Sequence, residues 1–199
     1  MQISVIRTME PKQYLYKIEG YNSVFGKANH NFNMFPLRIK VCRDDTCFEM
    51  RQRGGILRIL AGIISLLYSD SFFSFDIYLN DNYVGYSETE EYGGAFHFHI
   101  EADVLELRAH SNSTYSVLEN GKQVAVITKQ SYSSFEQNKY TIWFESDKER
   151  IMDVILLLCM FIDNRFHKDG NNSWHSDKWE KTFVLDDEYE ERASWRPVS

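Results

Sequence analysis

The segment that most constrains the fold is a run of nine consecutive apolar residues, Val154–Ile162. A capping box, Ser146-Asp147-Lys148-Glu149, comes shortly before it, and the serine and glutamate of such a box satisfy free N–H groups at the start of a helix. We therefore predict a helix over residues 147–166. A helix lying on a sheet keeps one polar face, whereas this run has none over about two and a half turns. The helix must be enclosed on nearly every side.

The enclosing material must come from strands, because most of the preceding chain alternates apolar and polar residues. Turn-forming residues separate the runs, among them Asp44-Asp45, Asn80-Asp81-Asn82 and Asn120-Gly121. About ten candidate strands with short connections favour an antiparallel sandwich or barrel. The candidates are Tyr14–Glu19, Leu37–Cys42, Cys47–Met50, Phe72–Leu79, Tyr83–Tyr86, Phe96–Ile100, Val104–His110, Tyr115–Leu118, Gln123–Thr128, Ser131–Phe135 and Tyr140–Glu145.

The predicted fold class is mainly β (α+β): a closed antiparallel barrel of about ten to twelve strands around a hydrophobic C-terminal central helix. The alternative is a two-layer α+β core in which a second helix covers the first. Residues 56–69 could form that helix, because Ile56, Leu60, Ile63 and Leu67 recur at helical spacing. A buried strand is the other interpretation of this isoleucine-rich segment.

The order of these segments resembles a known family. Phe75-Asp76-Ile77-Tyr78 leads through a turn to Val84-Gly85-Tyr86, and Tyr140-Thr141-Ile142-Trp143 leads to a capped apolar helix that ends Phe161-Ile162-Asp163-Asn164. This pattern resembles the tubby C-terminal superfamily, which includes the plant LURP-one-related proteins, the phospholipid scramblases and small bacterial relatives. The resemblance covers residues 14–167 and implies a twelve-stranded barrel around a hydrophobic central helix.

The sequence also departs from that superfamily. It lacks residues matching the tubby C-terminal signature, a cysteine-rich palmitoylation cluster and a recognisable calcium-binding loop. Phosphoinositide binding and lipid scrambling therefore cannot be assigned to particular residues of this sequence. We expect a barrel domain over residues 1–167, with an inserted amphipathic helix at 56–69. A C-terminal extension follows over residues 168–199, and its Trp174 and Trp179 favour packing on the barrel, addition of a strand or exchange with a neighbour.

Charge and targeting signals narrow the class of partner. The chain carries 22 Lys and Arg against 29 Asp and Glu, a net charge of −7, which argues against general nucleic-acid binding. No apolar leader with a small-residue cleavage site begins the chain, and the apolar segments Ile56–Tyr68 and Ile151–Ile162 fall short of the about 20 residues of a membrane span. We expect a cytoplasmic protein, either free or held at a membrane surface.

The three cysteines do not form a disulfide scaffold. Cys42 and Cys47 flank the Asp44-Asp45 turn, where a cross-strand disulfide is geometrically conceivable, but a reducing compartment would keep them as thiols. Cys159 lies in the apolar run and is expected to be a small core residue.

Two groups of residues are candidate sites. His97, His99 and Glu101 alternate along one strand and share a face, so they could bind zinc or a similar ion with help from a neighbouring strand. The alternative is an ordinary solvent-facing strand side.

Arg51, Arg53 and Arg58 cluster before the apolar face of residues 56–69, and such an arrangement could bind a phospholipid headgroup on an anionic membrane surface, or a partner subunit. The alternative is a segment that plugs one end of the barrel.

The sequence contains no nucleophile-elbow, P-loop, dinucleotide-binding or HExxH motif, and we expect no cofactor. We predict a non-catalytic interaction module that binds lipids or a membrane surface peripherally. One alternative is a protein-interaction domain that binds a protein partner or self-associates as a homo-oligomer. A metal-dependent enzyme that uses His97 and His99 is the other.

Overall fold

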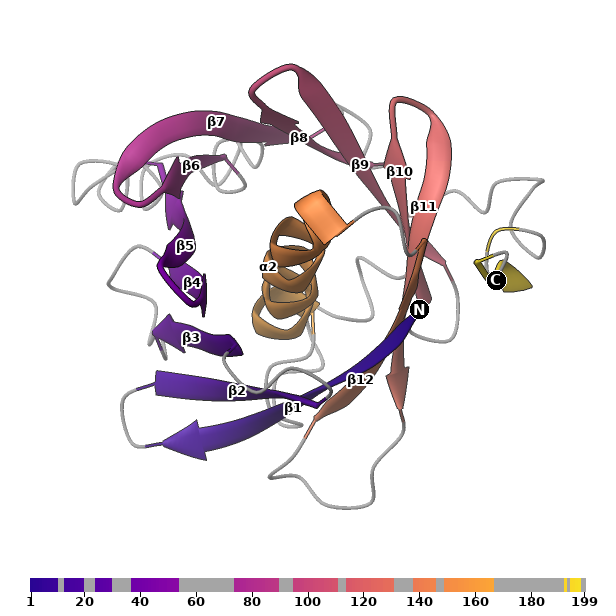
Figure 1. Cartoon of the computed structure of the whole chain (residues 1–199), viewed down its shortest axis with the longest axis horizontal. Helices are drawn as coiled ribbons and strands as arrows, with labels where there is room; N and C mark the ends of the chain where they lie inside the picture. The colour runs from indigo at the N-terminus through magenta and orange to yellow at the C-terminus, as the bar shows by residue number, and fades with distance from the viewer. Residues whose placement is uncertain are drawn as a thin grey trace, which may run out of the picture.

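A closed β-barrel encloses the apolar segment. The computed structural model describes residues 1–10, 13–19, 24–29, 37–53, 74–89, 95–110, 114–130, 138–145, 149–166, 192 and 194–197. Strands adjacent in sequence pair antiparallel, and the first strand pairs with the last. Figure 1 looks down the ring of strands onto the long helix α2 (Glu149–Phe166) inside it. The predicted fold class, a closed barrel around a C-terminal helix, is confirmed.

Twelve strands form the wall of the barrel. They are β1 (Gln2–Glu10), β2 (Gln13–Glu19), β3 (Val24–Asn29), β4 (Arg38–Arg43), β5 (Thr46–Gln52), β6 (Phe75–Leu79), β7 (Asn82–Thr89), β8 (Phe96–Ile100), β9 (Asp103–His110), β10 (Thr114–Glu119), β11 (Lys122–Gln130) and β12 (Lys139–Phe144).

Pairing between β1 and β12 closes the ring. Ile3 lies opposite Ile142, and Val5 lies opposite Tyr140. All four side chains are buried, so alternate residues of both strands face the interior. Because each strand has a partner on both sides, the barrel leaves no row of unpaired backbone N–H and C=O groups at a sheet edge.

The interior of the barrel is filled by α2. Every residue from Met152 to Asn164 is buried, and Leu156–Phe161 have no measurable exposure. A ring of about eight strands can be filled by wall side chains alone, whereas a wider ring needs further material inside. The nine apolar residues supply it, and the two-layer alternative is therefore wrong.

The helix lies closer to one wall than to the other, in contact with β3, β4 and β5. On that side Gly26 of β3 permits the close approach, because a Cβ at this position would lie 1.8 Å from Met160 Cε. Further round the ring, Phe75 of β6 and Phe96 and Phe98 of β8 meet Phe161 of the helix edge-on, with centroids 5.4, 5.4 and 5.9 Å apart.

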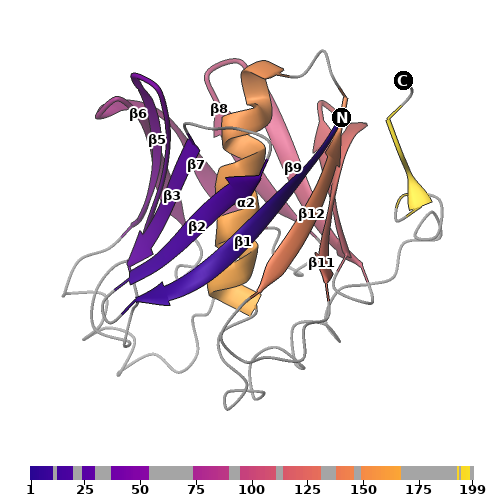
Figure 2. The ribbon, with the colours of Figure 1, turned by 60° about the horizontal axis from the view of Figure 1, so that its bottom comes forward.

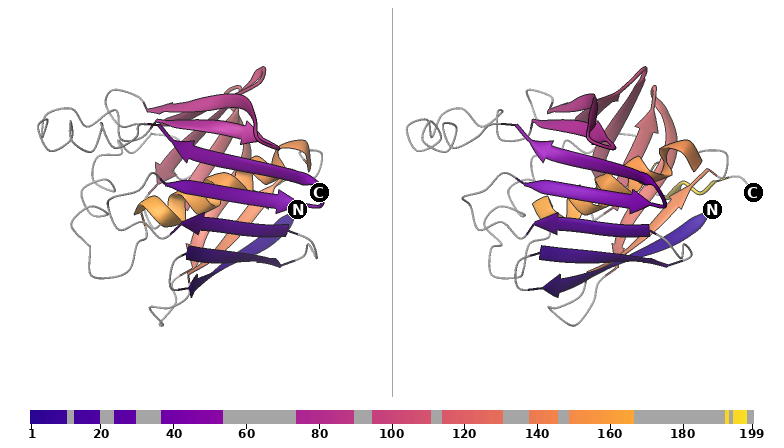
Figure 3. Two further views of the ribbon diagram at one scale, coloured as in Figure 1. Left: turned by 90° about the vertical axis from the view of Figure 1, so that its left-hand side faces the viewer. Right: turned by 60° about the vertical axis from the view of Figure 1, so that its left-hand side comes forward.

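Tight turns join the strands at the end of the barrel where α2 begins (Figures 2 and 3). They are Asp44-Asp45, Asn80-Asp81, Glu101-Ala102 and Asn120-Gly121. Asp and Asn tolerate the positive φ angles that such turns need, and Asp44, Asn80, Asp81 and Asn120 adopt them. The turns predicted at three of these places are confirmed. Glu101, at φ 54°, is an unusual residue for this conformation.

Two strands were missing from the sequence prediction. β1 alternates cleanly, but it turns Arg7 rather than an apolar residue toward the interior. β3 has Gly26 and Ala28 on its inner face, which gives almost no hydrophobic signal. The other candidate strands with described residues each overlap a strand of the barrel.

Several expectations concern residues outside those that the structure describes. They are the helix over residues 56–69, the strand Ser131–Phe135, the capping residues 146–148 and most of the extension 168–199. Within the extension, Gln123 Nε2 of β11 donates to the backbone oxygen of Arg192 at 2.8 Å. The Arg196 guanidinium lies 4.9 Å from the centroid of the Trp143 ring. These two described residues therefore lie against the outside of the barrel.

Candidate functional site

A pocket of about 370 Å³ opens at the end of the barrel where α2 begins. The first turns of the helix form one side of it, and the ends of β4 to β9 form the other. Of the tight-turn residues at this end, Glu101 contributes to the lining. The lining residues are Arg43, Thr46, Phe48, Leu79, Val84, Ile100, Glu101, Asp103, Leu105, Ile151, Asp153 and Val154.

The walls of the pocket are apolar. Leu105, Ile151 and Val154 are buried and form its floor. Phe48, Val84 and Ile100 pack against the core cluster but are only partly buried. The core of the barrel is therefore incompletely covered here, which is typical of a site that receives an apolar group.

An ion pair crosses one side of the pocket from the barrel wall to the helix. Arg43 at the end of β4 donates to Asp153 Oδ2 through Nη2 at 2.9 Å and through Nε at 3.3 Å. The Asp153 side chain is 4% exposed and that of Arg43 is 27% exposed. Since a buried carboxylate is costly without a partner, this arginine compensates the one acidic residue near the start of the apolar run.

Two further carboxylates belong to the turn between β8 and β9. Glu101 is exposed, and Asp103 is half-buried at the start of β9. Among the described residues of the lining, the charged groups are therefore Arg43 and the carboxylates of Asp153, Glu101 and Asp103.

A second polar cluster lies at the opposite end of α2, around Asp163. Its Oδ2 accepts from Arg7 Nη1 at 3.2 Å and from the Tyr16 hydroxyl at 2.8 Å. Its Oδ1 accepts from Asn138 Nδ2 at 2.6 Å and from the Tyr140 hydroxyl at 2.8 Å. Four donors from β1, β2, β12 and the residue before β12 thus converge on one carboxylate with no measurable exposure.

Three titratable groups near Asp163 have raised pKa values. Burial raises the pKa of the Tyr16 hydroxyl well above its usual value, and the negative charge of Asp163 raises it further. The pKa of Tyr140 is raised by the same two causes in the same order. Burial also raises the pKa of the Cys159 thiol, with a smaller contribution from Asp163. All three groups stay protonated in the folded state, which fits a structural rather than a nucleophilic role.

The two ion pairs fix the helix at both ends. Asp153 and Asp163 are ten residues apart, so their directions around an α-helix differ by about 80°. Their partners lie on β4 and β1, three steps apart in a ring of twelve strands, which is about a quarter of the circumference. The angle between the two aspartates around the helix is therefore similar to the angle between Arg43 and Arg7 around the barrel.

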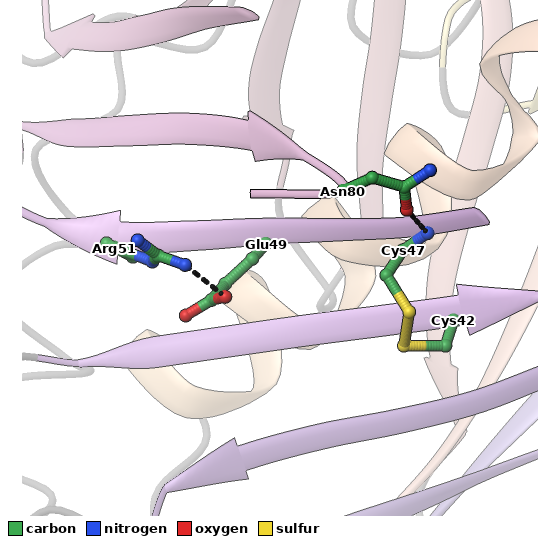
Figure 4. The surroundings of a disulfide bond; sticks show 5 residues. All are labelled: Cys42, Cys47, Glu49, Arg51 and Asn80. Atoms are coloured by element: carbon green, nitrogen blue, oxygen red, sulfur yellow. Dashed lines mark hydrogen bonds and ion pairs between the residues drawn. A yellow bond between two sulfur atoms is a disulfide. The ribbon is translucent and has the colours of Figure 1, made fainter. Parts of the chain in front are cut away.

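The structure pairs the described members of the predicted basic cluster with acidic side chains. Arg51 donates to Glu49 at 2.8 Å and to Asp81 at 2.6 Å, as part of Figure 4 shows. Arg53 donates through Nε to Asp76. Arg58 lies outside the described residues. The charges of Arg51 and Arg53 are therefore compensated by neighbouring carboxylates.

The predicted metal group does not converge on one point. His99 Nε2 lies 2.8 Å from Glu88 Oε1 on β7, and its ring stacks on Tyr86. His97 lies between Glu88 and Glu106 in the strand register, while Glu101 belongs to the pocket rim. Among the described residues, no three His, Cys, Asp or Glu side chains are placed to hold a metal ion.

Cys42 and Cys47 form a disulfide, shown in Figure 4, which corrects the expectation that they stay as thiols. The β4–β5 register sets the two residues directly opposite, with Cα atoms 4.1 Å apart. The bond closes the hairpin whose loop carries Arg43 and Thr46 of the pocket. Cys159 is a buried free thiol, as predicted.

Fold and site together define the class: a closed twelve-stranded antiparallel barrel, filled by a C-terminal helix, with a partly apolar pocket at one end. Comparison of the chain with protein-family models, with curated proteins and with solved structures gave no match. Within the described part of the chain, no helix has the length and hydropathy needed to cross a membrane.

Sequence reasoning missed the pocket and its ion pair. Arg43 and Asp153 are 110 residues apart, and only the closed barrel brings them together. One signal was present: a lone aspartate inside an apolar run needs a buried cation as its partner. The same reasoning applies to Asp163 and to Arg7, the basic residue on the inner face of β1.

Proposed function

We propose that the chain is a tubby-like barrel that acts as a non-catalytic binding module. Support for the tubby-like assignment comes from the topology, because a twelve-stranded antiparallel barrel around a C-terminal apolar helix is the arrangement that the sequence resemblance implies. The family's activities do not enter the proposal, since fold alone does not define function.

The observation that carries the binding function is the pocket beside the start of α2. Its volume of about 370 Å³ lies within the range of small-molecule sites, roughly 300–1,000 Å³. Phe48, Val84 and Ile100 leave apolar surface partly exposed there. Covering that surface with an apolar ligand would remove it from water, which is the main source of affinity at such sites.

Two observations favour binding over catalysis and over a lipid-headgroup site. Among the described lining residues, the polar side chains are carboxylates, a guanidinium and the Thr46 hydroxyl, and none is the histidine or cysteine that most often supplies a base or nucleophile. Arg51 and Arg53 are already compensated by acidic neighbours, so an anionic headgroup would have to compete with Glu49, Asp81 and Asp76. Binding at the pocket therefore ranks above membrane binding.

The test is a binding titration with N-phenyl-1-naphthylamine, an uncharged apolar dye that becomes fluorescent in apolar sites. We expect saturable binding at one site per chain. Val84→Trp and Ile100→Trp each place a large ring in the pocket and should weaken dye binding at least tenfold. Tyr83→Trp is the matched control, because Tyr83 is an exposed residue on the same strand as Val84.

Circular dichroism and thermal melting would establish that all three variants fold. Dye binding that is absent in the unmodified protein, or that survives in both folded pocket variants, would overturn the proposed function.

A further inference from the structure

We infer that the outer face of β10–β12 is a docking site for a peptide segment, and that its occupant is the chain's own C-terminal extension, residues 168–199. This inference concerns a surface separate from the pocket and goes beyond the proposed function. It follows from the burial of side chains that point outward, from the strand register that gathers them, and from two contacts made by the end of the extension.

The first observation is burial on the outside of the barrel. Val126 of β11 lies between Ala125 and Ile127, which belong to the core cluster, so its own side chain points outward. It nevertheless has no measurable exposure, and the same holds for Ser116 of β10. On β3, by contrast, the outward side chain of Lys27 is exposed. Another part of the chain therefore covers the outer face of β10–β12.

The strand register gathers the covered residues into one patch. Val126 lies opposite Ser116 on one side and opposite Trp143 on the other. Leu118, a further buried residue of this face, lies opposite Gln123. The patch thus combines two aliphatic side chains, an indole ring and two hydrogen-bonding groups. Such a surface fits a polypeptide, which offers backbone carbonyl groups together with apolar and cationic side chains.

The end of the extension makes two contacts with this patch. Gln123 Nε2 donates to the backbone oxygen of Arg192 at 2.8 Å and to Ser116 Oγ at 3.1 Å. The Arg196 guanidinium lies over the Trp143 ring, 4.9 Å from its centroid. Figure 1 shows this end of the chain beside β11, outside the ring of strands. Because Gln123 and Trp143 are the register partners of the two buried aliphatic residues, the extension is placed to cover them.

The covalent link between extension and barrel strengthens the docking. A tethered segment binds at an effective concentration far above that of a separate molecule, so a few contacts are enough. A separate peptide of the same chemistry, with an arginine beside an aromatic residue, must displace the extension before it binds. Release of the extension would expose an apolar surface of the kind that favours association.

The experiment measures access to the covered face in the full chain. Val126→Cys places a thiol at the centre of the patch, and iodoacetamide reaches it only when the cover opens. Without reductant the other cysteines stay silent, because Cys42 and Cys47 form a disulfide and Cys159 is buried. We expect alkylation at least about tenfold slower than in the reference variant Lys27→Cys, whose position is exposed.

The decisive variant adds Gln123→Leu/Arg196→Ser to Val126→Cys, which removes both contacts with the extension. Alkylation at residue 126 should then become about tenfold faster. The matched control is Arg38→Ser/Gln52→Leu, which removes the same two side-chain types from β4 and β5 and should leave the rate unchanged. Leu118→Cys is a second reporter, and circular dichroism establishes that each variant folds.

Rapid alkylation of the Val126→Cys and Leu118→Cys proteins would overturn the docking site, as would slow rates that Gln123→Leu/Arg196→Ser leaves unchanged. Protection that is lost on dilution, together with a dimer in analytical ultracentrifugation, would assign the cover to a second copy and overturn the proposed occupant. The dye titration at the pocket is a separate measurement, so its outcome tests the proposed function independently.

Discussion

Arg7 and Asp163 meet inside the barrel, with Nη1 of the arginine 3.2 Å from Oδ2 of the aspartate and both side chains almost fully buried. The pair links the first strand of the wall to the last turns of the central helix, across 156 residues of sequence. The Arg7 guanidinium also lies over the Tyr14 ring, 4.6 Å from its centroid. The four-donor cluster around Asp163 therefore ties strands from both ends of the barrel sequence to one helical residue.

Replacing Asp163 by Asn should destabilise the protein by about 3–5 kcal/mol, because it leaves a buried arginine without its counter-charge. Urea denaturation measures the free energy of unfolding. The double variant Arg7→Met/Asp163→Asn should recover part of the loss, since it removes both buried charges and keeps an amide oxygen as an acceptor for the Tyr16 and Tyr140 hydroxyls. Asp81→Asn breaks an ion pair whose carboxylate is 79% exposed and should cost less than about 1 kcal/mol. An Asp163→Asn protein as stable as the Asp81→Asn protein would refute a stabilising role for the cluster.

The stability of the protein should fall at alkaline pH. Tyr16, Tyr140 and Cys159 have pKa values in the folded state raised above their ordinary values of 10.0 and 9.0. Above those ordinary values the unfolded chain has released protons that the folded chain still holds, so the free energy of unfolding decreases as pH rises. These three groups contribute no pH dependence below about pH 8, where they are protonated in both states.

The measurement is urea denaturation between pH 7 and pH 11. Tyr16→Phe, Tyr140→Phe and Cys159→Ala should each make the alkaline decline less steep, although each lowers stability at pH 7. Tyr83→Phe is the control, because Tyr83 is exposed and its substitution should leave the slope unchanged. An identical slope in all four variants would contradict the assignment.

Reduction of the Cys42–Cys47 disulfide should lower stability by about 2 kcal/mol or less, because the bond closes a loop of only a few residues. Alkylation followed by mass spectrometry gives a sharper result. The native protein should take up no label, the reduced native protein two, and the reduced unfolded protein three, since Cys159 is buried. Two labels before reduction would show that Cys42 and Cys47 are free thiols, as expected for a protein in a reducing compartment. Labelling in intact cells would report that compartment directly.

Anionic membranes provide a test of the basic cluster. Since Arg51 and Arg53 are paired with acidic side chains, we expect Arg51→Gln/Arg53→Gln to leave co-sedimentation with phosphatidylserine vesicles unchanged. Lys17→Gln/Lys27→Gln, on the outside of β2 and β3, removes the same charge elsewhere. Strong vesicle binding that is lost only in the arginine variant would support the lipid-binding alternative. Arg58→Gln is tested separately.

The sequence predicted those parts of the fold that depend on local pattern. The apolar run identified α2 as an enclosed helix, and the Asp44-Asp45 and Asn120-Gly121 turns identified hairpins, because both signals come from neighbouring residues. β1 was missed since Arg7 follows Ile3 and Val5 on its inner face, and β3 was missed since Gly26 and Ala28 replace large apolar side chains on its inner face.

The pocket could not be predicted in the same way. Its walls come from six different strands and the helix, and its rim depends on which turns share one end of the barrel. A sequence can indicate that Asp153 needs a cation, but the choice of Arg43 depends on the ring of strands and on the direction of the helix. Candidate sites inferred from nearby residues, such as His97 and His99, instead became outer-face pairs of the barrel wall.

The order of segments along the chain has a consequence for how the protein is made. The wall closes through β1 and β12, and the helix that fills it is encoded after both. A growing chain on the ribosome therefore holds an unfilled, incomplete sheet until residue 166 has been synthesised. Such long-range pairing makes folding slow and leaves apolar strands uncovered meanwhile. We expect the nascent protein to depend on chaperones until its last helical turn emerges, and premature termination before α2 to yield chains that aggregate.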